Sequence, residues 1–187
     1  MMRASFAMLR RFRRDEAGTL LAETVIVLPM MLWAFLALFV YWDAYRSDNT
    51  SQKAAYTVSD MITRETVDLP AVYPTGMRNL VRYLVDNDQS VKLRVTSFTW
   101  SQANTRYEVD WSRSPDNAMP ALTTTTIQDV KSQIPVIADG DHYILVETEV
   151  SFHPAFNVGI DDLTMKEFIV TRIRFVPKLC LIGVACS

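Results

Sequence analysis

The hydrophobic pattern of the first part of the chain changes at Trp42. Residues 19–65 are predicted to form one long helix, which is apolar on all sides as far as Trp42 and amphipathic beyond it. Residues 24–42 carry no charged side chain, and their length and composition suit a membrane-spanning helix. In the second half, one stripe at helical spacing is predicted to pack on a soluble domain: Ala54, Ala55, Val58, Met61 and Ile62.

Beyond this helix the hydrophobic period changes from helical to strand-like. A proline-rich turn at 69–76 precedes a predicted second helix at 77–85, which Asp86-Asn87-Asp88 ends. Alternation with a period of two then predicts four strands, at 91–95, 106–111, 144–152 and 168–175. The phase slips at Ser97-Phe98, where a β-bulge fits, and a short helix is expected within 123–134.

This order of elements predicts an α+β fold with a small, mainly antiparallel sheet. One face of the sheet needs an apolar cover, and the amphipathic half of the long helix is expected to supply it. Trp100 and Trp111 are expected to pack in the core. The domain boundaries that follow are a leader at 1–18, the long helix at 19–65 and an α+β domain at 66–187.

Charge is distributed unevenly between the leader and the remainder. Residues 1–18 hold five arginines and two acidic residues, a net charge of +3, whereas the remainder holds 14 basic and 19 acidic residues, a net charge of −5. The positive-inside rule therefore places the N-terminus in the cytoplasm and the α+β domain outside it, in the periplasm. An acidic body also argues against nucleic-acid binding. The apolar run exceeds the h-region of a secretory signal peptide, and no small-x-small cleavage pattern follows it.

One acidic residue stands at the start of the apolar run. Glu23 follows the basic stretch Arg10–Arg14 and the glycine Gly18. A carboxylate at the centre of a membrane helix costs about 2.5–3.5 kcal/mol on insertion scales, so Glu23 is a functional candidate. Pro29, inside the run, removes one backbone hydrogen bond and is expected to kink the helix.

The processing site of type IV prepilins has a similar order of features. A basic segment is followed by a glycine, a glutamate five residues later and an apolar helix, and this chain resembles that pattern. Residues 13–18, 27–32 and 49–58 resemble the TadE/TadG-like minor pilins of tight-adherence (Tad) pili more closely, and 146–152 and 170–177 do so loosely. Thr24 departs from the tyrosine that major pilins of this class often carry, which favours a minor pilin, or pseudopilin.

The resemblance implies a pilin-like fold and cleavage by a prepilin peptidase between Gly18 and Thr19. Glycine suits the position before the cut because it has no side chain to obstruct the peptidase. Glu23 would neutralise the new α-amine of Thr19, within one subunit or between neighbours, as the pilus assembles. Partners would be other pilin and pseudopilin subunits. The protein would be a single-pass inner-membrane protein that joins the extracellular pilus, with a role in cell adhesion.

A different class of function remains open: an uncleaved single-span anchor that carries a periplasmic binding domain. An enzyme is not expected, because the chain has no glycine-rich phosphate loop, no G-x-S-x-G and no H-E-x-x-H. No cofactor is expected either. The group at 139–142 lacks the ligand number of a calcium loop and is interpreted as a polar turn, so no metal site is predicted.

Cys180 and Cys186 are the only cysteines. In an oxidising periplasm they can form a disulfide, which would stabilise the fold by about 2 kcal/mol because its loop is short. Two unpaired thiols in a loose tail are the alternative. Their spacing does not match a zinc site.

Overall fold

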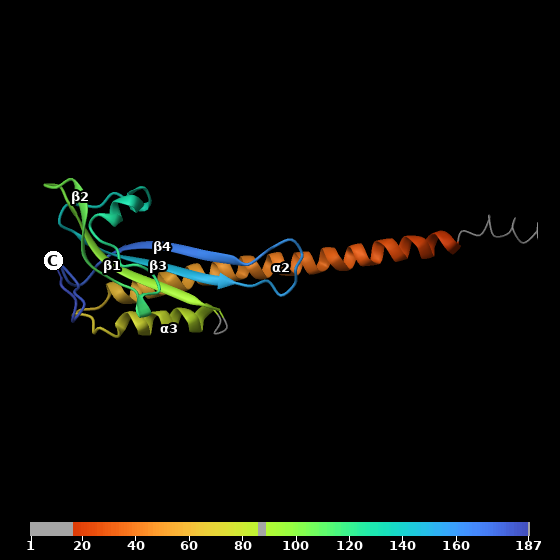
Figure 1. Cartoon of the computed structure of the whole chain (residues 1–187), viewed down its shortest axis with the longest axis horizontal. Coiled ribbons are helices and arrows are strands. Elements are labelled where there is room, and N and C mark those ends of the chain that lie inside the picture. The colour runs from red at the N-terminus through yellow and green to blue at the C-terminus, as the bar shows by residue number, and fades with distance from the viewer. Residues whose placement is uncertain (1–16, 86–88, 187) are drawn as a thin grey trace, which may run out of the picture. The chain divides into compact units, whose positions relative to one another are not determined.

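The computed structural model describes residues 17–85 and 89–186 (Figure 1). Most of the expected leader (1–16) and the expected helix end at 86–88 lie outside these residues. In chain order the elements are α2 (Ala17–Thr63), α3 (Tyr73–Val85), β1 (Val91–Ser101), β2 (Arg106–Arg113), the 3₁₀ helices η1 (Pro115–Asn117) and η2 (Thr126–Gln133), β3 (His142–Phe152) and β4 (Leu163–Arg172).

The described chain divides into two compact units. One contains the residues of α2 up to Asp43 together with Pro154–Ile160 from the β3–β4 connection. The other contains Ala44–His153 and the chain from Asp161 onward, which includes the second half of α2, α3 and all four strands. The long helix therefore contributes residues to both units.

The four strands form one antiparallel sheet with the order β2-β1-β3-β4. The β1–β2 register shifts between Ser97 and Phe98, where the sequence predicted a bulge. The long helix packs on this sheet, so the predicted α+β fold is confirmed. Hydrophobic alternation located β2 and β3 to within two residues and gave the start of β1, because each has an apolar face to bury, but β1 continues beyond the predicted 91–95 to Ser101.

The second half of α2 covers one face of the sheet (Figure 1). Ala54, Ala55, Val58 and Ile62 are buried, as predicted, but Met61 is 40% exposed and does not belong to the packed stripe. Buried positions of α2 recur with helical spacing at 51, 54–55, 58–59 and 62–63, and 61 falls between them. From α3, Met77 and Val81 join this core, and the sheet supplies Leu93, Val95, Ile144, Val146 and Val150.

The opposite face of the sheet is also covered, which the sequence analysis did not anticipate. Phe98, Tyr107 and Leu145 pack there with apolar residues of the β2–β3 connection: Leu122, Ile127, Ile134 and Ile137. Trp100 packs on this side, whereas Trp111 packs on the helix side. Both tryptophans therefore lie in apolar clusters, but in different ones.

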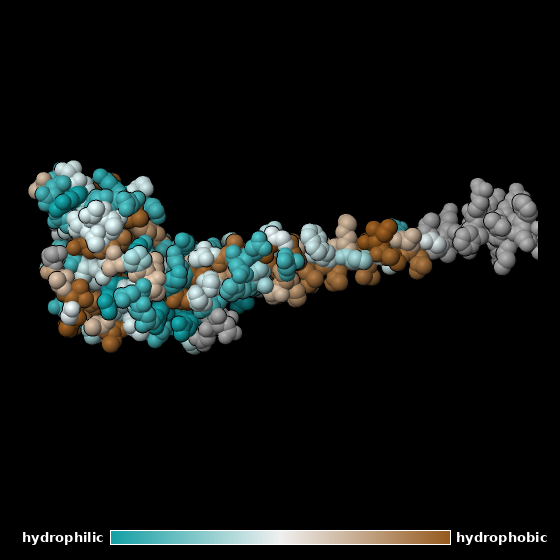
Figure 2. Space-filling model, viewed as in Figure 1, coloured by the Kyte–Doolittle hydropathy of each residue, from teal (hydrophilic) through white to brown (hydrophobic). Residues whose placement is uncertain are grey.

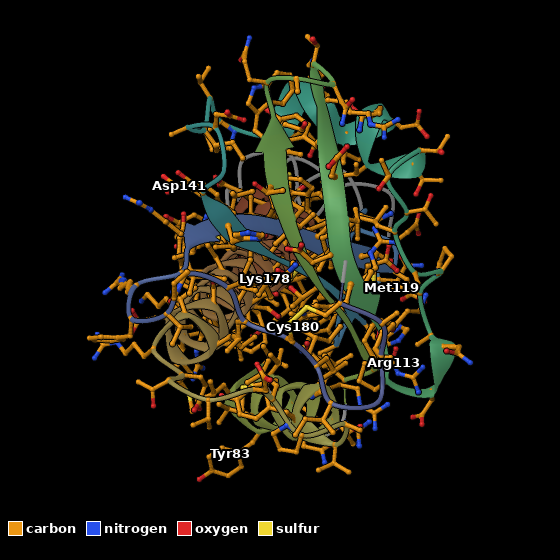
Figure 3. All side chains as sticks on the ribbon, turned by 90° about the vertical axis from the view of Figure 1, so that its left-hand side faces the viewer. Tyr83, Arg113, Met119, Asp141, Lys178 and Cys180 are labelled. Carbon is orange, nitrogen blue, oxygen red and sulfur yellow. A yellow bond between two sulfur atoms is a disulfide. The ribbon has the colours of Figure 1, made fainter. Side chains whose placement is uncertain are left out.

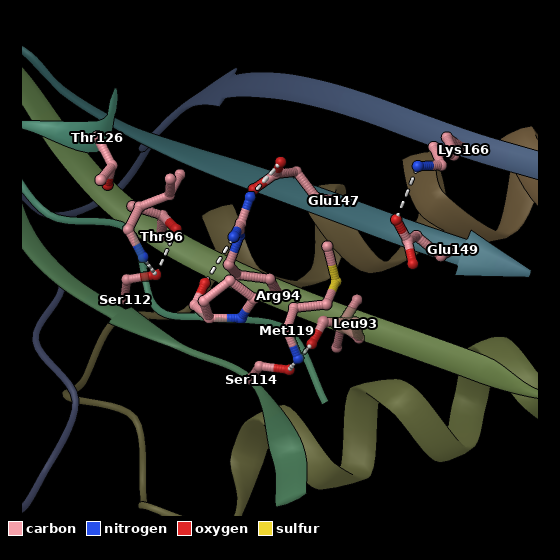
Figure 4. Close-up of polar contacts among 12 residues, drawn as sticks. Leu93, Arg94, Thr96, Ser112, Ser114, Met119, Thr126, Glu147, Glu149 and Lys166 are labelled. Carbon is pink, nitrogen blue, oxygen red and sulfur yellow. Dashed lines mark hydrogen bonds and ion pairs between the residues drawn. The ribbon is translucent and has the colours of Figure 1, made fainter. Parts of the chain in front are cut away.

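A buried ion pair anchors the β2–β3 connection to the second face (Figure 4). The Arg94 guanidinium donates two hydrogen bonds to Glu147, at 2.7 and 2.6 Å, and a third to the Pro120 carbonyl at 2.6 Å. The two side chains are only 10% and 11% exposed. Both charges are thus paired and satisfied by a planar, bidentate contact.

The predicted starts of α3 and β4 were wrong. Helix α3 begins at Tyr73, inside the expected turn, because Pro74 fits the first turn of a helix, where no N–H is needed. The short helix expected within 123–134 is confirmed as the 3₁₀ helix η2. Strand β4 begins at Leu163 and ends at Arg172, so Phe175 lies beyond it. Its first half contains three polar residues, including Lys166 paired to Glu149 at 3.1 Å, which weakened the hydrophobic signal at its start.

The C-terminal segment is part of the core and not a loose tail. Cys180 and Cys186 are bonded, with sulfurs 2.07 Å apart (Figure 3). Leu179 and Leu181 are buried. The Leu69 amide donates to the Cys180 carbonyl at 2.9 Å, and the Trp111 indole donates to the Leu179 carbonyl at 2.7 Å.

Removing the acidic partner of the buried pair should destabilise the protein strongly. Glu147→Ala leaves the Arg94 charge buried and unpaired, which costs about 3–5 kcal/mol in unfolding free energy. The control is Lys166→Ala, which breaks an exposed pair and should cost less than about 1 kcal/mol. Urea unfolding of the full chain in detergent micelles, followed by tryptophan fluorescence, measures both. Equal losses for the two variants would contradict the prediction.

Candidate functional site

The part of α2 before Asp43 exposes apolar side chains around its circumference. Between Leu21 and Trp42 almost every large apolar residue is exposed, and brown, apolar side chains mark this part of the helix in Figure 2. The helix is long and apolar enough to cross a membrane. An apolar surface of this extent needs a lipid or protein environment.

Glu23 lies on this exposed surface, in the second turn of the described helix. It shares a shallow groove with Thr24 and the apolar residues Val27, Leu28, Met31 and Leu32. Glu23 is the only charged residue between Ala17 and Trp42. One carboxylate therefore faces outward from the otherwise uncharged first part of α2.

Gly18 and Thr19, the predicted cleavage site, both have helical backbone. A Cβ on Gly18 would meet no atom of the described residues within 4 Å, so packing there does not require glycine. Within a helix glycine costs about 1 kcal/mol relative to alanine. Gly18 is thus an unfavourable helical residue that the described fold does not explain. Further along, α2 continues as a helix through Pro29.

A second polar site lies within the sheet unit, and the sequence analysis missed it. Asp110 is buried, and its carboxylate accepts a hydrogen bond from Ser97 at 2.9 Å. It also pairs with His142 Nδ1 at 2.8 Å and Lys178 Nζ at 2.9 Å. These partners come from β1, from the start of β3 and from the C-terminal segment, whose Lys178 and Cys180 are labelled in Figure 3.

The β-bulge explains why Asp110 is buried. Strict alternation places Asp110 on the polar side of its strand, opposite Val109 and Trp111. The register shift places Asp110 between the Cα pairs Phe98–Val109 and Ser97–Trp111, as the extra residue of the bulge. A bulge redirects a side chain in this way. The phase slip at Ser97-Phe98 is the sequence signal that predicts a reoriented side chain on the neighbouring strand.

Hydrogen bonds hold Asp110 in its charged form. Burial by itself would raise the pKa of Asp110, but hydrogen bonds from His142, Lys178 and Ser97 and the charge of His142 outweigh it, so that the pKa lies below its ordinary value. An open hollow next to this cluster is lined by Asp141, His142 and Arg172–Pro177. Arg172 pairs there with Asp141 at 2.7 Å.

These groups have the features of a structural network. His142, interpreted from the sequence as part of a polar turn, begins β3 and binds a buried carboxylate instead. Ser97 donates to Asp110 and not to His142, so the three residues do not form the Ser–His–Asp arrangement of a nucleophile with its base. Among residues 17–85 and 89–186, no group of three His, Cys, Asp or Glu side chains could hold a metal ion.

Comparison with protein-family models, with curated proteins and with solved structures gave no match to this chain.

Asp110 should make stability depend on pH in the acidic range. The pKa of Asp110 is lower in the folded than in the unfolded chain. Its contribution to the unfolding free energy is therefore complete above the pKa of the unfolded chain, near 4. That contribution is lost as the pH falls through the pKa of the folded chain. Asp110→Asn should lower the unfolding free energy at pH 7 by about 1.5–3 kcal/mol and flatten its fall below pH 4.

Unfolding of both proteins between pH 2 and pH 7 measures this effect. The control is Asp129→Asn, which makes the same change at an exposed position and should keep the wild-type profile. A wild-type acid profile in the Asp110 variant would refute the assignment.

Proposed function

We propose that this protein is a minor pilin, or pseudopilin, of a tight-adherence type IV pilus. It is made as a single-pass inner-membrane precursor with its N-terminus in the cytoplasm and its α+β domain in the periplasm. Prepilin peptidase cuts it between Gly18 and Thr19. It then joins other pilin subunits through α2 and initiates, caps or stabilises the pilus, as a structural subunit and not as an enzyme.

The observation that carries this proposal is the single carboxylate of Glu23 on an exposed apolar helix. An isolated carboxylate is expensive in lipid, and a nearby positive charge offsets that cost. Cleavage before Thr19 creates such a charge, an α-amine, four residues or about 6 Å along the helix from Glu23. In the assembled pilus the exposed apolar side chains around Glu23 then contact neighbouring subunits.

Gly18 gives independent support. Helix stability favours other residues at this position, and the described fold leaves room for a side chain there. A peptidase that must approach the backbone closely supplies a reason for glycine. The small α+β unit that follows the apolar segment is the part of a pilin expected outside the membrane.

The deciding experiment determines the N-terminal residue and the intact mass of the protein isolated from native membranes. It compares strains with and without prepilin peptidase. A peptidase-dependent start at Thr19 is the expected result. A start at Met1 or Met2 in both strains would overturn the proposal and would favour an uncleaved anchor with a periplasmic binding domain.

Glu23→Gln tests the role of the charge separately from processing. Breaking a buried ion pair costs about 3–5 kcal/mol, so we expect incorporation into sheared pili to fall at least about tenfold. Cleavage and membrane insertion should be unchanged, because the amide keeps the shape of the side chain. Quantitative blots of pilus and membrane fractions measure these quantities.

The matched control is Asp48→Asn, the same kind of change at an exposed site of α2 beyond the apolar segment. It should leave incorporation unchanged. Normal incorporation of Glu23→Gln, or an equal loss in both variants, would count against the proposed role of Glu23.

A further inference from the structure

The loop between β3 and β4 brings apolar side chains onto the membrane-length part of α2. Val158 is buried against Ala37 and Val40, and Leu36 and Ile160 pack beside them. The Phe156 and Phe39 rings lie edge to face, with centroids 6.4 Å apart. Pro154–Ile160 and this part of α2 belong to the same compact unit. The loop therefore packs on the apolar part of α2 within that unit.

The loop is itself apolar at alternate positions. Phe156, Val158 and Ile160 are separated by small or polar residues, and Gly159 has a φ of +101°, which favours glycine. Phe156 remains 45% exposed beside the exposed side chains of α2. Where the chain enters and leaves the loop, His153 and Asp162 pair at 2.9 Å. Polar residues therefore flank the apolar loop in the sequence on both sides.

The position of the helix contacts gives the depth of the loop in a bilayer. If residues 24–42 fill the hydrocarbon core, Leu36 and Val40 precede its end at Trp42 by about 9 and 3 Å, at 1.5 Å per residue. Segments that lie in the interface bury apolar side chains about 5–10 Å into the boundary between headgroups and acyl chains. A loop in contact with these residues lies in that zone, where aromatic side chains are favoured.

We propose that Pro154–Ile160 is a second membrane contact, which inserts Phe156 into the lipid interface beside the end of the apolar segment of α2. The partner is the lipid surface and not a protein groove. Asp161 and Asp162 adjoin the loop and no lysine or arginine lies within it, so insertion does not require anionic lipid. This inference rests on the membrane anchoring in the proposed function.

Depth-dependent quenching in vesicles tests the inference on the full chain. Because both native cysteines are in a disulfide, a single introduced cysteine can carry an environment-sensitive fluorophore under non-reducing conditions. The label is placed at Phe156→Cys and, in case that change perturbs the loop, at the neighbouring exposed Ala155→Cys. The vesicles contain phosphatidylcholine with a quencher either near the headgroup or at the end of the acyl chain.

Two further sites calibrate the measurement. Met31→Cys, exposed in the apolar segment of α2, reports the span itself, and Ala103→Cys, in the exposed β1–β2 turn, reports water. We expect the loop labels to be quenched severalfold more by the headgroup-proximal quencher than Ala103→Cys, and Met31→Cys to be quenched most by the deep one.

Loop labels that behave like Ala103→Cys while Met31→Cys is quenched would overturn the second contact and leave the anchor intact. An unquenched Met31→Cys would reject the membrane span, and with it both this inference and the anchoring in the proposed function.

Discussion

The packing of the second half of α2 on the sheet is the interaction on which the rest of the structure depends. Ala54 and Ala55 are almost completely buried at this contact, and the Ser59 hydroxyl lies 2.7 Å from that of Thr171. Small side chains let the helix backbone approach the strands closely, and the apolar face of the sheet is buried as a result. Because α2 contains neither glycine nor proline between Asp43 and Thr63, the same helix continues from the exposed apolar segment into this contact.

Buried polar residues in the sheet unit bind a different segment of the chain on each face of the sheet. On the face of the sheet opposite α2, Arg94 forms a bidentate pair with Glu147 and also binds the Pro120 carbonyl, which holds the β2–β3 connection in place. Next to the helix-side core, the β-bulge turns Asp110 inward, where Lys178 from the C-terminal segment reaches it. Each charge finds a partner from a different part of the chain, so alternative strand registers would leave charges buried and unpaired.

Periodicity predicted the elements that have one clear apolar face. The packed stripe of α2, the strands β1 and β2 and the bulge at Ser97-Phe98 all follow from local pattern. The early start of β4, the second cover of the sheet and the burial of Asp110 depend on partners distant in sequence, such as Glu149 for Lys166. At the candidate assembly site, sequence alone selected Gly18 and Glu23. The structure added that Glu23 is exposed and that packing does not explain Gly18.

The C-terminal segment has a consequence for the order in which the chain folds. Leu179 and Leu181 complete the core between Trp111 and the α2–α3 connection, yet they are synthesised after all four strands. As the chain is synthesised, all four strands therefore precede the segment that covers one part of their apolar interior. The core closes only when this segment arrives. Cys180 and Cys186 lie in that same segment, so their disulfide can form only after the part of the chain that completes the core has been synthesised.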